Sequence, residues 1–399
     1  MPIARRALLA AAAPGVALAA EPPRRRKEFG VCGPNATASD PTPTARRVPV
    51  TSIPITVRIA PSRQPGANGV QMTYSSQRGA DLEPEIRRFV EKTSEDYKRL
   101  GGEGPLTPAQ AREVAERVRE PWRQGGPVMA WTRERLVPTR HGPVAVRAYA
   151  PVADPKGAAL VYIHGGGWTI FSLDTHDRLM REYAARAGVT VVGIDYALSP
   201  EARFPVAHEQ CVDVLHWLAD HGGDLGIEPG RVAVGGDSAG GNLAIGAALA
   251  LRDAGRPDLI KALVLNYASF GGDFTEEYHV RFGGPGYMLS SDEVSHFIGN
   301  YLAKPEDRFD QRVRIVDADL TDLPPTFMAI PECDLLSCQS LEMVPRLRAA
   351  GVPLKAEVYA GATHSFLEAM SISKVANRAL DDEAVWLREV LAAGTDRLA

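Results

Sequence analysis

Apolar segments alternate with amphipathic helical segments from about residue 134 onward, and this alternation restricts the fold more than any other feature. Runs such as "AALVYI", "VTVVGIDY" and "TFMAIP" are almost uninterrupted, whereas "DTHDRLMREYAARAG" has helical spacing and ends at Gly188. Strands that are apolar on both sides must be covered on both sides, which is typical of parallel sheets between helical layers. The sequence therefore predicts an α/β fold, with a mostly parallel central sheet and helices on both faces.

Segments of different composition indicate the domain organisation. Residues 1–75 are rich in Pro, Arg, Ser, Thr and Gly, which is typical of a leader or a disordered extension. Residues 76–132 contain two helical patterns, the second with Thr107 as N-cap, and are expected to form a helical cap. Residues 133–399 are expected to form the main α/β domain, in which 271–302 is an insertion that contributes to the cap.

Charge and hydropathy exclude several kinds of partner. Charged residues make up 24% of the 399 residues and the net charge is -4, which gives no reason to expect a nucleic-acid partner. No apolar run is long enough to cross a bilayer, so we expect no stable membrane insertion. Metal-ligand spacing and a disulfide framework are not indicated by the cysteines, Cys32, Cys211, Cys333 and Cys338.

The N-terminal segment "MPIARRALLAAAAPGVALAA" resembles an export signal, because a basic start precedes an apolar run. Pro14 interrupts that run, and the strongly basic segment "EPPRRRKEFG" follows it, which is unusual directly after a cleavage site. These features favour a cytoplasmic location, with export through the signal-like N-terminus as the alternative.

A serine stands in the glycine-rich turn "AVGGDSAGGN" between an apolar strand and a helical segment. Gly236-Asp237-Ser238-Ala239-Gly240 matches G-x-S-x-G, the nucleophile elbow that lifts a serine hydroxyl above a strand end. Such a turn strains the serine backbone, so Gly236 and Gly240 must leave space around it. An incidental serine at a helix start is the alternative, and a P-loop is disfavoured because no Gly-Lys-Ser/Thr follows. We therefore expect Ser238 to be a nucleophile.

A second glycine-rich segment, "YIHGGGW", follows an earlier apolar strand. A serine that attacks a carbonyl group requires donors for the developing oxyanion, and glycine amides can approach a substrate closely. An HGGG-type loop works together with the amide that follows the nucleophile. We expect the donors to be Gly166, Gly167 and Ala239, with Gly165 as a weaker candidate and His164 as the anchor of the loop.

The base is predicted by elimination among the three histidines that follow the serine, which are His279, His296 and His364. The first two lie in the 271–302 insertion. Only His364, in "YAGATHSFLE", directly follows a strand, where a base can meet a nucleophile that also stands at a strand end.

The acid is expected before the base and at another strand end. The segment "TFMAIPECDLL" offers Asp334, with Glu332 as its rival. The predicted role of Asp334 is to hold the imidazole tautomer and to stabilise the imidazolium. A serine, an acid and a base of this kind require neither a metal nor a cofactor.

These motifs together resemble the hormone-sensitive-lipase-like (bacterial family IV) esterases of the α/β-hydrolase superfamily. The resemblance rests on "HGGGW", "DYALSPEARFP", "GGDSAGGNLA", "CDLL" and "GATHSF", and spans roughly residues 80 to 392. It implies an α/β-hydrolase fold, esterase activity on short acyl chains, an N-terminal helical cap and, as in many members, a homodimer. The chain departs from the family pattern at Ala197, Leu335 and Ser365, where arginine, proline and glycine are usual.

The expected function is that of a serine carboxylesterase that hydrolyses short-chain acyl esters through an acyl-enzyme. A deacetylase, amidase or carbamate hydrolase would use the same residues and is the alternative. A non-catalytic binding protein of this fold is remote, because all three members of the triad are present. Trp168 and Tyr267 are the candidates for substrate contact, ahead of Phe282 and Tyr287.

Overall fold

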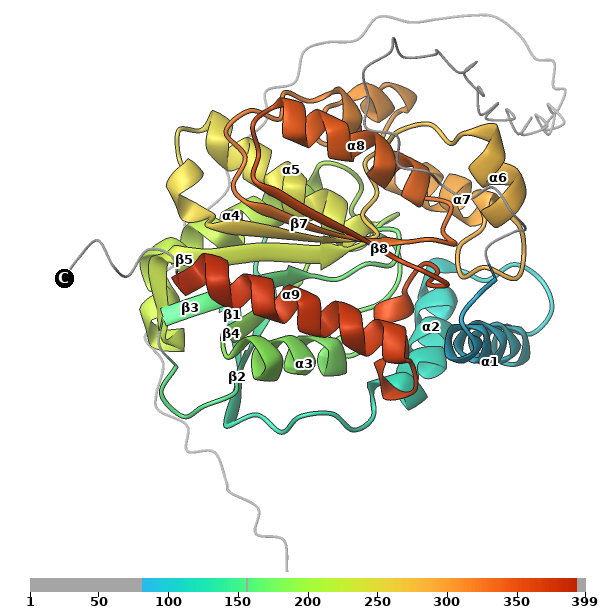
Figure 1. Ribbon diagram of the computed structural model, residues 1–399, viewed down its shortest axis with the longest axis horizontal. Helices are drawn as coiled ribbons and strands as arrows, with labels where there is room; N and C mark the ends of the chain where they lie inside the picture. The colour runs from blue at the N-terminus through green and yellow to red at the C-terminus, as the bar shows by residue number, and fades with distance from the viewer. Residues whose placement is uncertain (1–80, 156, 393–399) are drawn as a thin grey trace, which may run out of the picture. The chain divides into compact units, whose positions relative to one another are not determined.

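The computed structural model describes residues 81–155 and 157–392, so the predicted leader or extension lies outside the described residues. An eight-stranded sheet has the order β1-β2-β4-β3-β5-β6-β7-β8 (Figure 1). β2 runs antiparallel to β1 and β4, and the remaining neighbours are parallel, which confirms the predicted mostly parallel sheet. The strands are β1 (Trp131–Val137), β2 (Val144–Ala150), β3 (Gly157–Ile163), β4 (Thr190–Asp195), β5 (Ile227–Asp237), β6 (Ala262–Asn266), β7 (Thr326–Pro331) and β8 (Leu354–Tyr359).

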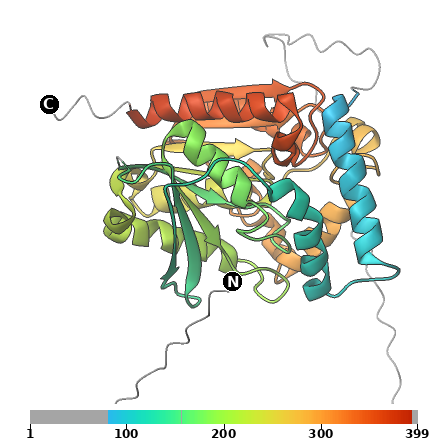
Figure 2. The ribbon, with the colours of Figure 1, turned by 90° about the horizontal axis from the view of Figure 1, so that it is seen from below.

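Helices cover both faces of this sheet. In Figure 1, α3 and α9 lie below the sheet, and α5 and α8 lie above it. Figure 2 shows α1 (blue) and α2 (teal) near one end of the sheet, where α2 also contacts α3. The α-helices are α1 (Pro84–Gly101), α2 (Pro108–Arg123), α3 (Asp177–Ala187), α4 (Val206–His221), α5 (Ala239–Asp253), α6 (Glu276–Phe282), α7 (Ser291–Tyr301), α8 (Ser337–Ala349) and α9 (Lys374–Ala392). Short 3-10 helices are η1 (Gly222–Leu225), η2 (Pro257–Leu259), η3 (Pro305–Phe309), η4 (Ile315–Asp317) and η5 (Phe366–Ser371).

The core consists of two apolar clusters, one on each face of the sheet. In β3, Val161 and Ile163 belong to the cluster that includes α4, α5 and α8. Leu160 and Tyr162 belong to the cluster that includes α3 and α9. Successive side chains of a strand point to opposite faces, and all four are fully buried. This is why the strands are apolar without alternation.

Local signals place the helix ends where the sequence predicts them. Thr107 caps α2 in a reciprocal capping box with Gln110. Gly188 ends α3 with φ 68°, a left-handed conformation that glycine adopts at low cost. In the described part of the chain, no helix is long and apolar enough to cross a membrane.

A buried carboxyl group joins α9, α3 and β6. Glu383 is fully buried, and its oxygens contact the Tyr183 hydroxyl and the Asn266 amide. With the Asn266 nitrogen donating to Glu383 (3.2 Å), its oxygen accepts from the Tyr183 hydroxyl (2.7 Å). Because the Tyr183 hydroxyl hydrogen is donated to Asn266, the contact between Tyr183 and Glu383 requires a hydrogen on the Glu383 carboxyl group. Burial raises the pKa of Glu383 to about 8, in keeping with a protonated carboxyl group.

We expect this carboxyl group to make the free energy of unfolding depend on pH. The folded-state pKa of about 8 exceeds the ordinary value of 4.5, so the native chain holds a proton that the unfolded chain loses. The stabilisation of the folded state by this proton is therefore complete below pH 4.5. As the pH rises from 4.5 towards 8, the free energy of unfolding falls by about 1.4 kcal/mol per pH unit. Denaturant titrations of wild type and Glu383→Gln at pH 5, 6, 7 and 8 measure it. The variant should lack this slope, and equal slopes in the two proteins would contradict the assignment.

Candidate active site

Ser238 forms the turn between β5 and α5 with a strained backbone. Its φ of 54° and ψ of -118° lie where residues other than glycine are rarely found. Neighbouring backbone holds this conformation, since Ser238 N donates to Asn266 O (2.9 Å) and Ser269 N donates to Ser238 O (3.1 Å). The turn leaves the serine at the carboxyl end of β5, on the wall of a pocket.

The glycines that flank the serine stand where no side chain fits. A Cβ atom on Gly240 would lie 1.9 Å from the carbonyl oxygen of Ile163. A Cβ atom on Gly236 would lie 2.5 Å from the same oxygen. Both contacts are with backbone at the end of β3, which cannot rotate away as a side chain could. The G-x-S-x-G pattern requires glycine at both positions because the end of β3 occupies the space that a side chain would need.

His364 and Asp334 form a hydrogen-bonded chain with Ser238. His364 Nε2 lies 2.8 Å from Ser238 Oγ, and His364 Nδ1 lies 2.8 Å from Asp334 Oδ2. The second oxygen of Asp334 accepts from Leu336 N (3.0 Å). Both ionisable side chains are almost fully buried, His364 in the loop after β8 and Asp334 in the loop after β7. With Nδ1–H donating to Asp334, Nε2 is free to accept the serine hydrogen.

The rival acid and the other histidines have other partners, although His296 lines the same pocket as Ser238. Glu332 accepts a hydrogen bond from Gly361 N (2.9 Å). His279 contacts Ser291 Oγ (2.8 Å), and His296 contacts the Asn300 amide (3.0 Å). The structure therefore brings together the three residues that the strand ends predict.

The loop after β3 presents backbone amides beside the serine. Gly166, Gly167 and Trp168 have φ values of 105°, 57° and 57°, three left-handed residues in succession. Gly165 N donates to the Asp237 carboxylate (3.0 Å), so the amide of this weaker candidate is already used. Among the described residues, no protein acceptor meets the amides of Gly166 and Gly167. These two glycines line the same pocket as Ser238 and Ala239.

Asp237, which precedes the serine, holds the start of this loop and was not predicted as a site residue from the sequence. Its buried carboxylate accepts from Tyr162 Oη (3.0 Å) and Gly165 N (3.0 Å), and lies 3.4 Å from His176 Nε2. Burial alone would raise the pKa of Asp237, but His176 and Tyr162 hold it below its ordinary value. A charged residue at the end of a buried strand is the signal that could have revealed it.

His164 fits the predicted role of anchor. Its imidazole stacks on the ring of Tyr196, with ring centroids 4.4 Å apart. Burial, together with the neighbouring His176, lowers the pKa of His164 to about 3, so this ring is neutral. His164 Nδ1 lies 2.7 Å from Gly165 O, and the imidazole that contacts Ser238 Oγ is that of His364.

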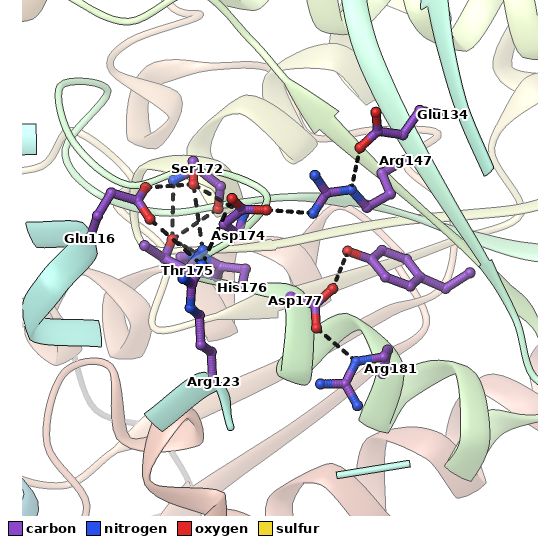
Figure 3. Close-up of polar contacts among 11 residues, drawn as sticks. Glu116, Arg123, Glu134, Arg147, Ser172, Asp174, Thr175, His176, Asp177 and Arg181 are labelled. Carbon is purple, nitrogen blue, oxygen red and sulfur yellow. Dashed lines mark hydrogen bonds and ion pairs between the residues drawn. The ribbon is translucent and has the colours of Figure 1, made fainter. Parts of the chain in front are cut away.

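A polar network continues from this loop to α2. Figure 3 shows the hydrogen bonds between Ser172 and Glu116 of α2 (2.6 Å) and between Thr175 and His176 Nδ1 (2.9 Å). The same network reaches β2 through Asp174, which accepts from Arg147 (2.7 Å). The segment that follows the glycines is thus held by side chains from several elements.

The pocket above the serine has a volume of about 470 Å³ and is lined mainly by apolar side chains. They include Val114, Trp168, Phe171, Leu289, Val294 and Phe297, which come from α2, the glycine loop, α7 and the segment before α7. Trp168 lines the pocket as predicted. Tyr267 does not line it: the residue is 1% exposed, and its ring packs edge-on against the His364 imidazole, with centroids 5.0 Å apart. Phe282 and Tyr287 pack against each other and also lie outside the lining.

A buried ion pair adjoins the pocket and was not predicted. Arg119 of α2 places Nε 2.9 Å from Glu368 Oε2 of η5, and both side chains are less than 5% exposed. Burial raises the pKa of Glu368, and the nearby Arg119 offsets this in part. In the described residues, no group of three or more His, Cys, Asp or Glu side chains could hold a metal ion.

Comparisons with known proteins agree with this geometry. Residues 160–368 match a family model described as the alpha/beta hydrolase fold. The acetyl esterase of Salmonella dublin is 37% identical over 265 residues, which are 66% of this chain and 81% of the relative. A hyperthermophilic esterase from Pyrobaculum calidifontis superposes with a TM-score of 0.72 at 31% identity, over 77% of this chain and 98% of that chain. A thermostable carboxylesterase from a metagenomic library gives 0.69 at 32% identity, over 72% and 98% of the two chains.

Proposed function

This chain belongs to the hormone-sensitive-lipase-like esterases of the α/β-hydrolase fold and is a carboxylic ester hydrolase, and from that premise we propose that Ser238, His364 and Asp334 perform the hydrolysis. The observation that carries the proposal is the unbroken chain of two 2.8 Å contacts from Ser238 through His364 to Asp334 at the pocket wall.

In the first half of the reaction, Ser238 Oγ attacks the ester carbonyl carbon while His364 Nε2 takes the hydroxyl proton. The carbonyl oxygen becomes an oxyanion, to which Gly166, Gly167 and Ala239 donate through their amides. The bond to the alcohol oxygen then breaks, and the alcohol leaves with the proton from His364. An acyl group remains on Ser238.

In the second half, water replaces the alcohol and the same groups act again. His364 Nε2 takes a proton from water as the water oxygen attacks the acyl carbon. The collapse of the second oxyanion returns that proton to Ser238 Oγ and releases the carboxylic acid. Asp334 accepts from His364 Nδ1–H throughout, which fixes the tautomer and stabilises the imidazolium.

We also propose that residues 81–132, the described part of the predicted 76–132 cap, and residues 271–302 form a cap over the site. α2 contributes Val114 and Arg119 to the pocket, and α7 contributes Val294 and Phe297. An apolar pocket of about 470 Å³ under such a cover suits a small soluble ester better than aggregated lipid. The named acetyl esterase relatives support the same substrate class.

A panel of p-nitrophenyl esters tests this substrate class. We expect kcat/KM to be higher for acetyl to hexanoyl esters than for dodecanoyl and longer esters, because a covered pocket has no room for a long chain. A p-nitrophenyl carbamate and the acetamide of p-nitroaniline belong in the same panel. An optimum at dodecanoyl or longer would contradict the short-chain proposal, and faster turnover of the carbamate or amide would assign the site to those substrates.

A further inference from the structure

The glycine loop requires support at both ends, because its backbone is strained. The side chain of Trp168 makes its left-handed conformation costly, by about 1 kcal/mol or more. Such conformations persist where surrounding contacts determine them. Asp237 supports the start of the loop through Gly165 N. At its end, Thr169 N donates to Gly166 O (3.0 Å) and Ser199 N donates to Trp168 O (2.8 Å).

Arg112 of α2 binds that end of the loop from outside the sheet. Its Nε donates to Thr169 O (2.9 Å), and its Nη2 donates to Ser199 O (2.8 Å). These carbonyls belong to the two segments that the Ser199–Trp168 hydrogen bond joins. Glu201 accepts a hydrogen bond from Nη1 of the same guanidinium (3.1 Å) and thereby fixes the plane of the guanidinium group.

The neighbouring turn of α2 repeats the connection. Glu116 lies one helical turn after Arg112, and accepts from Ser172 Oγ just beyond the loop. The face of α2 that carries Arg112 and Glu116 is therefore directed at the backbone around the predicted oxyanion site. Apolar contacts alone would hold α2 in place without selecting a loop conformation, whereas a guanidinium bonded to two carbonyls selects one.

We propose that Arg112 is a positioning residue for the oxyanion loop: by holding the carbonyls of Thr169 and Ser199, it couples docking of α2 to the alignment of the Gly166 and Gly167 amides. The inference rests on the proposed function, because it presumes that these amides bind the oxyanion. It assigns α2 a part in the chemical step in addition to covering the pocket.

Arg112→Met tests the proposal, because methionine keeps a long unbranched side chain and removes every donor. Arg117→Met is the control on the same helix, since Arg117 is exposed and makes no hydrogen bond or ion pair among the residues that the structure describes. We expect Arg112→Met to lower kcat for p-nitrophenyl acetate by about ten- to a hundredfold with KM within about threefold, and Arg117→Met to leave both unchanged.

A transition-state analogue separates positioning from general stability. An alkyl trifluoromethyl ketone forms a hemiketal with the nucleophile and places an oxyanion at the loop, whereas the matching methyl ketone probes pocket binding alone. For Arg112→Met, affinity for the trifluoromethyl ketone should fall by the same factor as kcat/KM, with affinity for the methyl ketone unchanged. Wild-type kcat in folded Arg112→Met, or a rise in KM alone, would overturn the proposal.

Arg112→Lys keeps the test decisive if the methionine variant does not fold. A single ammonium group cannot reproduce the planar fork that reaches both carbonyls, so kcat and analogue affinity should again fall together. Wild-type values for this variant would overturn the proposal. Ser238→Ala separates failure of the proposed function from failure of this inference. If Ser238→Ala retains activity, the proposed function fails. If Ser238→Ala is inactive while the Arg112 variants behave as wild type, only the inference about Arg112 fails.

Discussion

Replacement of Ser238 by alanine is expected to lower kcat for p-nitrophenyl acetate by about 10⁶-fold. The alanine side chain removes the atom that forms the acyl-enzyme, and His364 is left without the hydroxyl that it contacts at 2.8 Å. The remaining amides of the glycine loop can polarise a bound ester only weakly in the absence of a nucleophile. Initial rates at saturating ester, corrected for spontaneous hydrolysis, give the measurement.

Ser295→Ala is the matched control for this prediction. Ser295 lies on α7, and its hydroxyl donates to the Ser291 carbonyl (2.9 Å), so the same substitution should leave kcat within about twofold. Circular dichroism and the thermal unfolding midpoint should show both variants folded. Substantial ester hydrolysis by folded Ser238→Ala would remove the serine from the mechanism.

Gly240→Ala is expected to have the second largest effect, on both kcat and the free energy of unfolding. The added methyl group would lie 1.9 Å from Ile163 O and 2.6 Å from His164 O, which are backbone atoms. Either α5 or the end of β3 must move, at a cost of about 3 kcal/mol or more. A shift of α5 also moves the Ser238 turn, so kcat should fall by about a hundredfold or more.

The control for the glycine substitution is Gly223→Ala. A Cβ atom at Gly223 meets no atom within 4 Å, and its backbone is not left-handed, so the variant should retain wild-type activity and stability. Denaturant titration and ester hydrolysis of both variants make the comparison. If Gly240→Ala matches wild type in stability and rate, the close approach of β3 to the Ser238 turn is not a constraint.

The sequence predicts the elements of this site that depend on short-range patterns. G-x-S-x-G between a strand and a helix locates Ser238 because the strained turn requires glycines at fixed positions. Asp334 and His364 follow from chain order and from their places after strands. The parallel sheet then brings the three strand ends together, as the 2.8 Å contacts show.

Contacts between distant segments could not be read from those patterns. Arg112 and Arg119 lie on a helix that its N-cap predicts, but their partners around Ser199 and Glu368 belong to other segments, and no local spacing connects them. Tyr267 was predicted to contact substrate, but it directly follows β6 with a φ of 36°, and its ring packs against His364 and is not part of the pocket lining. Strand ends predict which residues approach the site, and the turn conformations decide where their side chains lie.

The central claim is that Ser238 forms a covalent intermediate within this hydrogen-bonded chain, and labelling with diethyl p-nitrophenyl phosphate tests it most directly. Mass spectrometry of the intact chain and of its peptides, taken as activity declines, gives stoichiometry and position together. We predict one diethylphosphoryl group per chain, on Ser238, with loss of activity in proportion to labelling, and no labelling of Ser238→Ala. Modification at another residue in step with inactivation, or full activity in chains labelled at Ser238, would contradict the account.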